Sequence, residues 1–367
     1  MTLHAKLGAS NAHRWLACGG SVAAEQAMPE TGSSPFALEG TAAHDLAEKA
    51  LVNGKQPSDF SDDAEMVEHV TTYTDYVRAA SVGADSVEYE QRVSYSDWVP
   101  EGFGTADAVI LKGDTIHVCD LKYGEGVRVD ADNNPQGMLY ALGAYAEFGY
   151  LSDFKQVLIS IVQPRLDHIS EWSISVKDLL KWAEWVSQRA EIALSPDAER
   201  VPGEKQCRFC SAKGNCPALM KYTESIIMSD FDDLDGIASP DALTDAQMRT
   251  VLDNKALIEG WLSAVQTVVQ DRLESGEGFE GYKLVEGRSL RKWFDDFEAE
   301  KVLGELIGDA AFKRSLISPA QAEKIVAKSE KAKLNDLIVK PSGKPTMVPD
   351  SDKRPAISLS GDDFEVC

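Results

Sequence analysis

The stretch that decides the fold reads Gly104-Thr-Ala-Asp-Ala-Val-Ile-Leu-Lys-Gly-Asp-Thr-Ile-His-Val-Cys-Asp-Leu-Lys122. It predicts two strands, 104–112 and 115–122, that pair as a hairpin through the Gly-Asp turn between them. Side chains two residues apart on a strand share a face, so Asp120 and Lys122 emerge on the same side of the sheet. Cys119 then points to the opposite side, where a free cysteine is expected as a small core residue.

Three polar side chains of this hairpin form a candidate hydrolytic site. Asp107 lies in the first strand and Asp120 and Lys122 in the second, so pairing lets the two carboxylates converge on one hard divalent cation, Mg²⁺ or Mn²⁺. Such an ion activates water and neutralises the charge that builds up when a phosphodiester is cleaved, while a lysine orients the water or stabilises the same charge. An isolated Asp-x-Lys is a weak signal, because any solvated strand can carry it.

An expected helix places a histidine near this hairpin. The helix begins near Thr41, so that His44 lies one turn inside its start and can reach a metal ion above the sheet. Glu48 is four residues further on the same helical face. The alternative interpretation is a capped surface helix that carries an exposed histidine.

A second helix, opened by Asn134-Pro135 and running to about Phe148, presents an amide and a phenol on one face. Gln136 and Tyr140 are four residues apart, so both side chains lie on the same side of this helix. These groups are suited to hydrogen-bonding a phosphate or stacking against a base. Ordinary amphipathic packing, with Tyr140 half-buried, is the alternative.

The remaining pattern predicts a mixed α/β core with crossover helices. A second region follows the acidic linker 229–235 and begins with the longest helical pattern, 244–275, and a short strand at 282–286. From residue 340 onward Pro, Gly, Ser and charged residues dominate, which predicts a flexible tail. The other core elements are expected to be helices at 9–27, 64–80 and 176–194 and strands at 86–95, 156–163 and 170–174.

The composition is that of a soluble globular protein, with 367 residues, 43% hydrophobic and 26% charged. No apolar stretch is long enough to span a bilayer, and the first residues lack the apolar run of a secretory signal, so a cytoplasmic protein without membrane partners is expected. The net charge of −23 argues against a generic nucleic-acid coat. It does not exclude an enzyme with a local basic groove, because divalent ions offset the carboxylates that such a site needs.

Four of the six cysteines form a possible ligand set: Cys18, then Cys207-x-x-Cys210, then Cys216. In a cytoplasmic chain such residues are more often ligands or buried thiols than disulfides. Four thiolates bind either zinc or a [4Fe–4S] cluster, and the spacing does not choose between them. Either group ties the first helix to the segment that closes the domain, so its expected role is structural.

Taken in order, these motifs resemble the RecB-type PD-(D/E)XK nucleases: His44, then Gly104-x-x-Asp107, then Asp120-x-Lys122, then Gln136-x-x-x-Tyr140. The cysteine pattern is similar to the iron–sulfur branch of that superfamily, which includes the AddB nuclease domain and the CRISPR-associated RecB-like exonucleases. Within the superfamily, phage and prophage proteins resemble this chain more closely still. In one respect the chain departs from the pattern, because Gly19 follows the first cysteine where the family usually has proline.

The resemblance covers residues 9 to about 220 and implies a restriction-endonuclease-like core, a central mixed sheet flanked by helices, with an iron–sulfur clip. It implies that a Mg²⁺ or Mn²⁺ ion is bound by His44, Asp107, Asp120 and the backbone carbonyl of Leu121. It favours a [4Fe–4S] cluster over zinc on the four cysteines. Lys122 is the implied catalytic lysine, Gln136 and Tyr140 the implied contacts to the site or to DNA, and Glu39 and Glu48 remain secondary candidates.

Together these observations predict a metal-dependent DNA nuclease, an exonuclease, that acts on single-stranded DNA or duplex ends in phage replication, recombination or repair. The alternative is a non-catalytic scaffold or partner-binding protein that kept the fold. A zinc-binding interaction module would leave the carboxylates unexplained. The expected domains are 1–225 for the nuclease with its cysteines, 226–339 for a mainly helical region and 340–367 for the tail. Phage replication or recombination proteins are expected as candidate partners of the acidic C-terminal region, and a homo-oligomer is compatible with the sequence.

Overall fold

The computed structural model describes residues 5–29, 32, 34–228, 245–285 and 296–307, together with 319, 322 and 326. The chain divides into two units, Met1–Val285 and Glu286–Cys367. The first unit contains the sheet, both predicted sites and the helices that surround them. Of the second unit the structure describes one helix of several turns, α11 (Asp296–Ile307).

Five strands form one mixed sheet, in the spatial order in which they occur along the chain. Neighbouring strands are antiparallel except β3 and β4, which are parallel because α5 (Pro135–Phe148) crosses from the end of one to the start of the other. The predicted α/β class is therefore confirmed, and each strand lies within two residues of its expected ends. The strands are β1 (Ser86–Ser94), β2 (Phe103–Lys112), β3 (Thr115–Leu121), β4 (Gln156–Gln163) and β5 (His168–Ser175).

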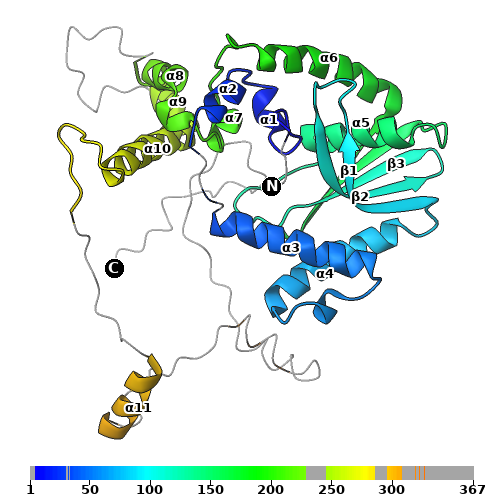
Figure 1. Cartoon of the computed structure of the whole chain (residues 1–367), viewed down its shortest axis with the longest axis horizontal. Coiled ribbons are helices and arrows are strands. Elements are labelled where there is room, and N and C mark those ends of the chain that lie inside the picture. The colour runs from blue at the N-terminus through cyan, green and yellow to red at the C-terminus, as the bar shows by residue number, and fades with distance from the viewer. Residues whose placement is uncertain are drawn as a thin grey trace, which may run out of the picture. The chain divides into compact units, whose positions relative to one another are not determined.

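Helices cover both faces of this sheet, as Figure 1 shows. On one face α5 and α6 (Val176–Leu194) bury Leu139, Leu142 and Leu179 against alternate strand residues. On the other face α3 (Pro35–Val52) and α4 (Ala64–Ala80) bury residues such as Leu46 and Val70. Burial of each such side chain contributes about 2 kcal/mol, so the two apolar layers hold the sheet between them.

The N-terminal segment corrects the expected helix at 9–27. It forms two short helices, α1 (Ala12–Trp15) and α2 (Ser21–Gln26), separated by a turn that contains Cys18. Gly20 explains the break, because a Cβ there would lie 2.5 Å from the carbonyl oxygen of Ala198. Its N–H donates to the Glu199 carbonyl at 2.9 Å. Cys18 is thereby turned toward a segment far away in sequence.

Three further expectations differ from the structure. Helix α3 begins at Pro35, where the Ser34 hydroxyl accepts from the N–H of Ala37, so the start predicted near Thr41 was wrong. The pattern at 244–275 forms two helices, α9 (Asp245–Asp253) and α10 (Lys255–Glu274). Residues 282–285 form no strand and have only an isolated bridge between Phe279 and Tyr282. The predicted linker 229–235 and tail 340–367 lie outside the described residues.

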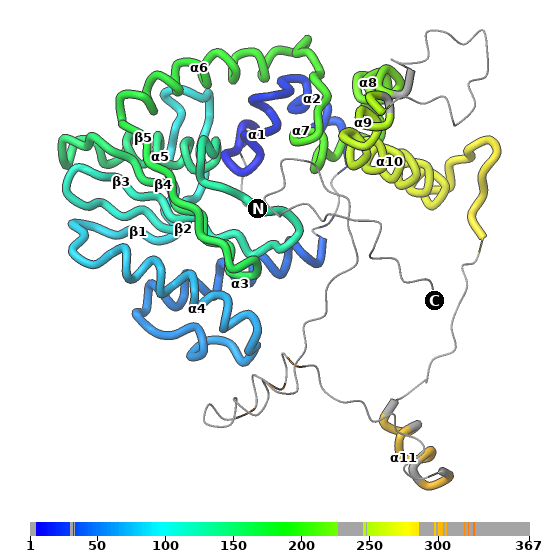
Figure 2. Tube along the Cα trace, turned by 180° about the vertical axis from the view of Figure 1, so that it is seen from behind, coloured from blue at the N-terminus to red at the C-terminus, as the bar shows by residue number. Residues whose placement is uncertain are grey.

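Helix α10 lies against the segment that carries the later cysteines, in the same unit as the sheet (Figure 2). That segment contains α7 (Glu204–Arg208), η3 (Lys213–Asn215) and α8 (Pro217–Met228). Leu219 and Ile226 of α8 and Leu257 of α10 form a small apolar cluster with Cys207. Within the part of the chain that is described, no helix has both the length and the apolar composition needed to cross a membrane.

Candidate functional site

The hairpin of β2 and β3 brings the two predicted carboxylates together. Ala108 pairs with Cys119 across the hairpin, so Asp107 and Asp120 lie on neighbouring strands at the same level. Oδ2 of Asp107 accepts a hydrogen bond from the backbone N–H of Leu121 at 2.6 Å. This contact fixes the Asp107 carboxylate against β3. Cys119 is fully buried on the α3 and α4 side of the sheet, which confirms that it points away from Asp120.

Helix α3 presents His44 to the same place. Its Nδ1 lies 3.2 Å from Oδ1 of Asp107. The buried positions Ala43, Leu46 and Ala47 turn one face of the helix toward the sheet and leave His44 at the edge of that face, half-buried. Burial lowers the pKa of His44, but the charge of Asp107 and the hydrogen bond to it outweigh this effect and raise the pKa to about 9. A positive group is therefore favoured beside Asp107.

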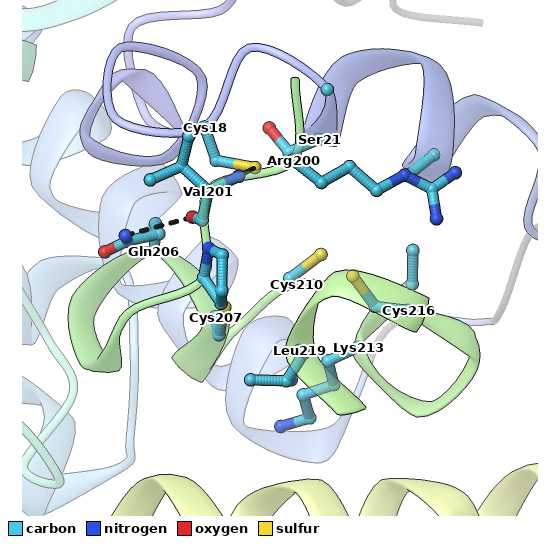
Figure 3. Close-up of a pocket in the computed structure, with 14 residues that line it drawn as sticks. Cys18, Ser21, Arg200, Val201, Gln206, Cys207, Cys210, Lys213, Cys216 and Leu219 are labelled. Carbon is cyan, nitrogen blue, oxygen red and sulfur yellow. Dashed lines mark hydrogen bonds between the residues drawn. The ribbon is translucent and has the colours of Figure 1, made fainter. Parts of the chain in front are cut away.

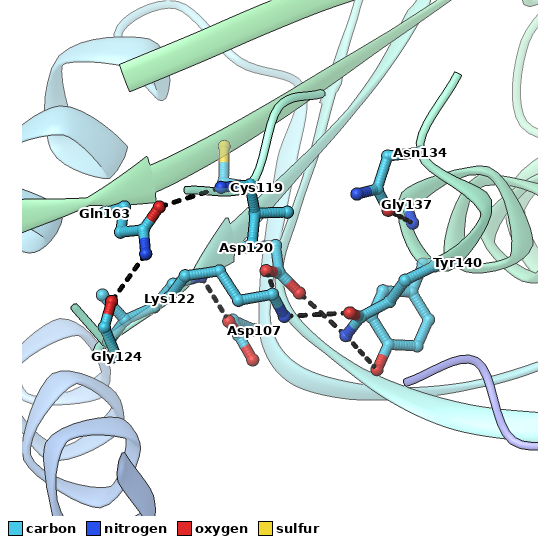
Figure 4. A network of polar contacts seen from close by, with 12 residues as sticks. Asp107, Cys119, Asp120, Lys122, Gly124, Asn134, Gly137, Tyr140 and Gln163 are labelled. Carbon is cyan, nitrogen blue, oxygen red and sulfur yellow. Dashed lines mark hydrogen bonds and ion pairs between the residues drawn. The ribbon is translucent and has the colours of Figure 1, made fainter. Parts of the chain in front are cut away.

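A second group of polar side chains surrounds Asp120, as Figure 4 shows. Lys122 Nζ lies 2.7 Å from Oδ2 of Asp120 and donates to Oε1 of Gln136 at 2.9 Å. Gln136 Nε2 lies 3.1 Å from Oδ1 of Asp120 and 3.2 Å from the Tyr140 hydroxyl. Burial raises the pKa of Asp120, Asp107 adds to the rise, and Lys122 opposes it. Gln136 and Tyr140 thus contact the predicted site directly.

The Gly104-x-x-Asp107 pattern has a structural basis in this arrangement. A Cβ on Gly104 would lie 2.7 Å from Cε1 of Tyr140, so only glycine lets the tyrosine ring pack over the start of β2. The ring is buried, and burial raises the pKa of its hydroxyl far above the usual range. Tyr140 therefore stays protonated and available as a hydrogen-bond donor.

Glu90 of β1 lies beside His44 and Asp107, and the sequence alone does not single it out. One ligand atom from each of Glu90, His44 and Asp107 lies within 4.8 Å of the other two. Burial raises the pKa of Glu90 to about 7, the charge of Asp107 adds to the rise and His44 opposes it. No local pattern marks Glu90, and pairing β1 with β2 is the step that would have placed it beside Asp107.

Gln163 at the end of β4 and Arg165 just after it contact the loop that follows Lys122. The fully buried Gln163 donates from Nε2 to the carbonyls of Gly124 at 2.6 Å and Val127 at 2.8 Å, and its Oε1 accepts from the N–H of Val129 at 3.1 Å. Arg165, in η2 (Pro164–Leu166), contacts this loop through Glu125 at 3.4 Å. Neither residue was singled out from the sequence, because only the folded loop shows what they bind.

The secondary candidates Glu39 and Glu48 do not join the group around Asp107. Glu39 Oε2 accepts from Arg165 Nη1 at 3.1 Å, which links α3 to the same loop. Glu48 is exposed on α3. Of Leu121, the structure gives an N–H bonded to Asp107 and a buried side chain, and its carbonyl stays a predicted ligand.

The four predicted cysteines line one cavity, shown in Figure 3. Cys18 Sγ accepts from the N–H of Val201 at 3.2 Å, and Cys207 Sγ accepts from the N–H of Gly203 at 3.4 Å. Backbone N–H groups aimed at sulfur stabilise a thiolate, so this cavity suits a thiolate-bound metal. Burial raises the pKa of the Cys210 thiol to about 11. Binding of a metal there must therefore displace protons.

Fold and sites together define an α/β protein with a five-stranded mixed sheet, a cluster of carboxylates and histidine at the sheet, and a separate four-cysteine cavity. The chain belongs to the family described as "Protein of unknown function (DUF2800)", whose sequence model matches residues 4–355. Among solved structures it is similar to one described as "Crystal structure of SSO0001". That match covers 48% of this chain and 85% of the other, with 15% identity and a TM-score of 0.24.

Proposed function

We propose that the protein is a metal-dependent deoxyribonuclease, an exonuclease, with a PD-(D/E)XK core. One observation carries this proposal: Asp107 of β2, Asp120 of β3, Lys122 just after β3 and His44 of α3 converge around one point of the sheet. A structural ion-pair network alone would not need a histidine, two carboxylates and a lysine at the same place. The net charge of −23 is compatible with this function, since divalent cations offset acidic groups at such a site.

The side chains present fit a Mg²⁺ or Mn²⁺ ion. Carboxylate oxygens are preferred by both ions, and the imidazole nitrogen of His44 favours Mn²⁺ of the two. Asp120 is 3% exposed, and its Oδ2 has no polar partner other than the Lys122 ammonium among the residues that the structure describes. His44, Asp107 and Asp120 would hold the ion. When bound, it would supply Lewis-acid activation of water and of the scissile phosphate.

The chain's own residues would orient the reaction. Lys122 keeps its ammonium beside Asp120 and Gln136, where it can direct a water or neutralise charge that develops on the phosphate. The Gln136 amide fixes both Asp120 and the Tyr140 hydroxyl. Because these donors are held by neighbours before substrate arrives, they need little reorganisation when a phosphodiester is bound.

The nuclease proposal is tested by incubating the purified protein with Mn²⁺ or Mg²⁺ and DNA labelled at the 5′ or 3′ end, single- and double-stranded. Asp120→Asn is the inactive variant. Asp114→Asn, in the exposed turn between β2 and β3, is the matched control. We expect wild type and Asp114→Asn to release labelled products at equal rates and Asp120→Asn to be slowed at least about a hundredfold. Equal inactivity of all three proteins on every substrate would favour the non-catalytic scaffold.

We further propose that the four-cysteine cavity holds a [4Fe–4S] cluster, with zinc as the alternative. The N–H···S contacts to Cys18 and Cys207 support a thiolate-bound group of either kind. Protein purified without oxygen should be brown and contain iron and acid-labile sulfide. A colourless protein with one zinc ion per chain would replace the iron assignment and leave the nuclease proposal unaffected.

A further inference from the structure

We propose that Glu90 of β1 is a further side-chain ligand of the divalent cation, in addition to His44, Asp107 and Asp120. This inference rests on the proposed metal-dependent function and goes beyond the ligand set given above. Ligand atoms of Glu90, His44 and Asp107 lie within 4.8 Å of one another. Ligands about 2.1 Å from an octahedral ion are about 3 Å apart when adjacent and about 4 Å apart when opposite, so the three groups need only small movements to share one ion.

The backbone at Glu90 supports a specific role. Its φ is 45°, in the left-handed region that side-chain-bearing residues adopt at a cost of about 1–2 kcal/mol. Of the four non-glycine residues with positive φ in the described part of the chain, Glu90 is the one that lies within a strand. Strained backbone of this kind is concentrated at functional sites, where the position of the side chain matters.

The strain also changes which face of the sheet the flanking side chains reach. Tyr89 and Val93 are four residues apart, so a regular strand would place both on one face. In the structure Tyr89 packs with α3 and α4, whereas Val93 packs with α5 and α6. On β2, Ala108 and Ala106 show the same reversal. The interruption therefore lies at the level of Glu90 on β1 and Asp107 on β2.

The pairing of the two strands brings Glu90 against another carboxylate. Tyr89 pairs with Ala108 and Gln91 pairs with Ala106, which sets Glu90 across from Asp107. Like charges directly opposite on a sheet are destabilising. Glu90 is half-buried, and no described residue donates a hydrogen bond to its carboxylate. Two carboxylates and one imidazole thus face one another, and a bound divalent ion would offset the repulsion between the carboxylates.

The test measures Mn²⁺ binding directly, by the loss of the free-ion EPR signal during titration of the purified protein. The variants are Glu90→Gln, which keeps the size but removes the charge, and Glu90→Gly, which suits the positive φ. Glu88→Gln, two residues away on the same strand, is the matched control. We expect both Glu90 variants to bind Mn²⁺ at least about tenfold more weakly. Glu88→Gln should bind as the wild type does, and the Tm of metal-free Glu90→Gly should be no lower than that of wild type.

The outcomes separate this inference from the nuclease proposal. If Glu90→Gln binds Mn²⁺ as tightly as wild type while wild type cleaves DNA, Glu90 is not a ligand and the proposed function stands. If Glu88→Gln weakens binding as much as Glu90→Gln, the effect belongs to the acidic surface and the inference fails. If wild type takes up no Mn²⁺, both proposals fail. Folded, stable Glu90 variants with weakened Mn²⁺ binding would establish the role.

Discussion

Lys122 places its ammonium 2.7 Å from the carboxylate of Asp120, at the point where β3 ends. Asp120 is nearly fully buried, whereas the Lys122 side chain is 27% exposed. The two members of the pair therefore differ in their surroundings. Removal of the lysine leaves a buried carboxylate without its partner, whereas removal of the carboxylate leaves a cation that can reach water.

From this asymmetry we predict that Lys122→Met lowers the free energy of unfolding of the metal-free protein by about 2 kcal/mol at pH 7, because Asp120 then loses the ammonium beside it. Asp120→Asn alone should change the stability by less than about 1 kcal/mol. The double variant should recover most of what Lys122→Met loses. Urea denaturation of the four proteins gives the coupling energy directly. A double variant no more stable than Lys122→Met would show that the two residues are not coupled.

One buried histidine should make the stability of the fold depend on pH. His117 of β3 is buried, and its Nε2 lies 2.7 Å from the Ser160 hydroxyl. Burial lowers the pKa of His117 to about 4, with a smaller contribution from Lys112, while Glu171 opposes the shift. In the unfolded chain the pKa of histidine is about 6.5. As the pH falls from about 6.5 to about 4, the unfolded state takes up a proton that the folded state refuses, so this histidine costs stability over that range.

We therefore expect wild type to lose up to about 3 kcal/mol more than His117→Gln between pH 7 and pH 4. Urea midpoints measured for both proteins across this range isolate the contribution of His117 to stability, because the carboxylates are the same in both proteins and their titration cancels in the comparison. Parallel pH profiles for the two proteins would mean that His117 takes up its proton as readily in the folded state as in the unfolded state.

The conformation of the loop that follows Lys122 should depend on Gln163, because the side-chain amide of Gln163 makes three hydrogen bonds to the backbone of that loop. Gln163→Leu keeps the side-chain volume but leaves the carbonyls of Gly124 and Val127 without this donor, at about 1–3 kcal/mol for each group that water does not reach. We expect faster hydrogen exchange and earlier proteolytic cleavage at 124–129. Gln156→Leu, on the exposed start of the same strand, should leave that segment protected as in wild type. Unchanged exchange at 124–129 in Gln163→Leu would show that Gln163 does not hold this loop in place.

Local patterns in the sequence account for much of this fold and for only part of the site. Asp120 and Lys122 could be placed on one face from the sequence, because side chains on a strand alternate between its two faces with a period of two residues. Ser34-Pro35 is a local signal for the start of α3, with a serine cap and a proline in the first turn, so the start near Thr41 was a wrong prediction from local sequence. The position of Glu90 beside Asp107 could not be predicted from local sequence, because it depends on the pairing of β1 with β2 and on a left-handed residue within the strand. The break at Gly20 likewise depends on a contact with Ala198.

The cavity formed by the four cysteines links two distant parts of the chain. Cys18 comes from the turn between α1 and α2, and the other three come from residues 207–216, so a metal bound to all four closes a very long loop of the chain. Such a link stabilises the fold chiefly by restricting the unfolded chain. We expect Cys18→Ser to lose most of the bound metal and to lower the Tm, because three ligands remain and the link is open. Cys119→Ala, which removes a buried thiol outside the cavity, should keep the wild-type metal content even where it lowers the Tm. Metal analysis beside thermal unfolding separates the two effects, and full metal content in Cys18→Ser would show that Cys18 is not a ligand.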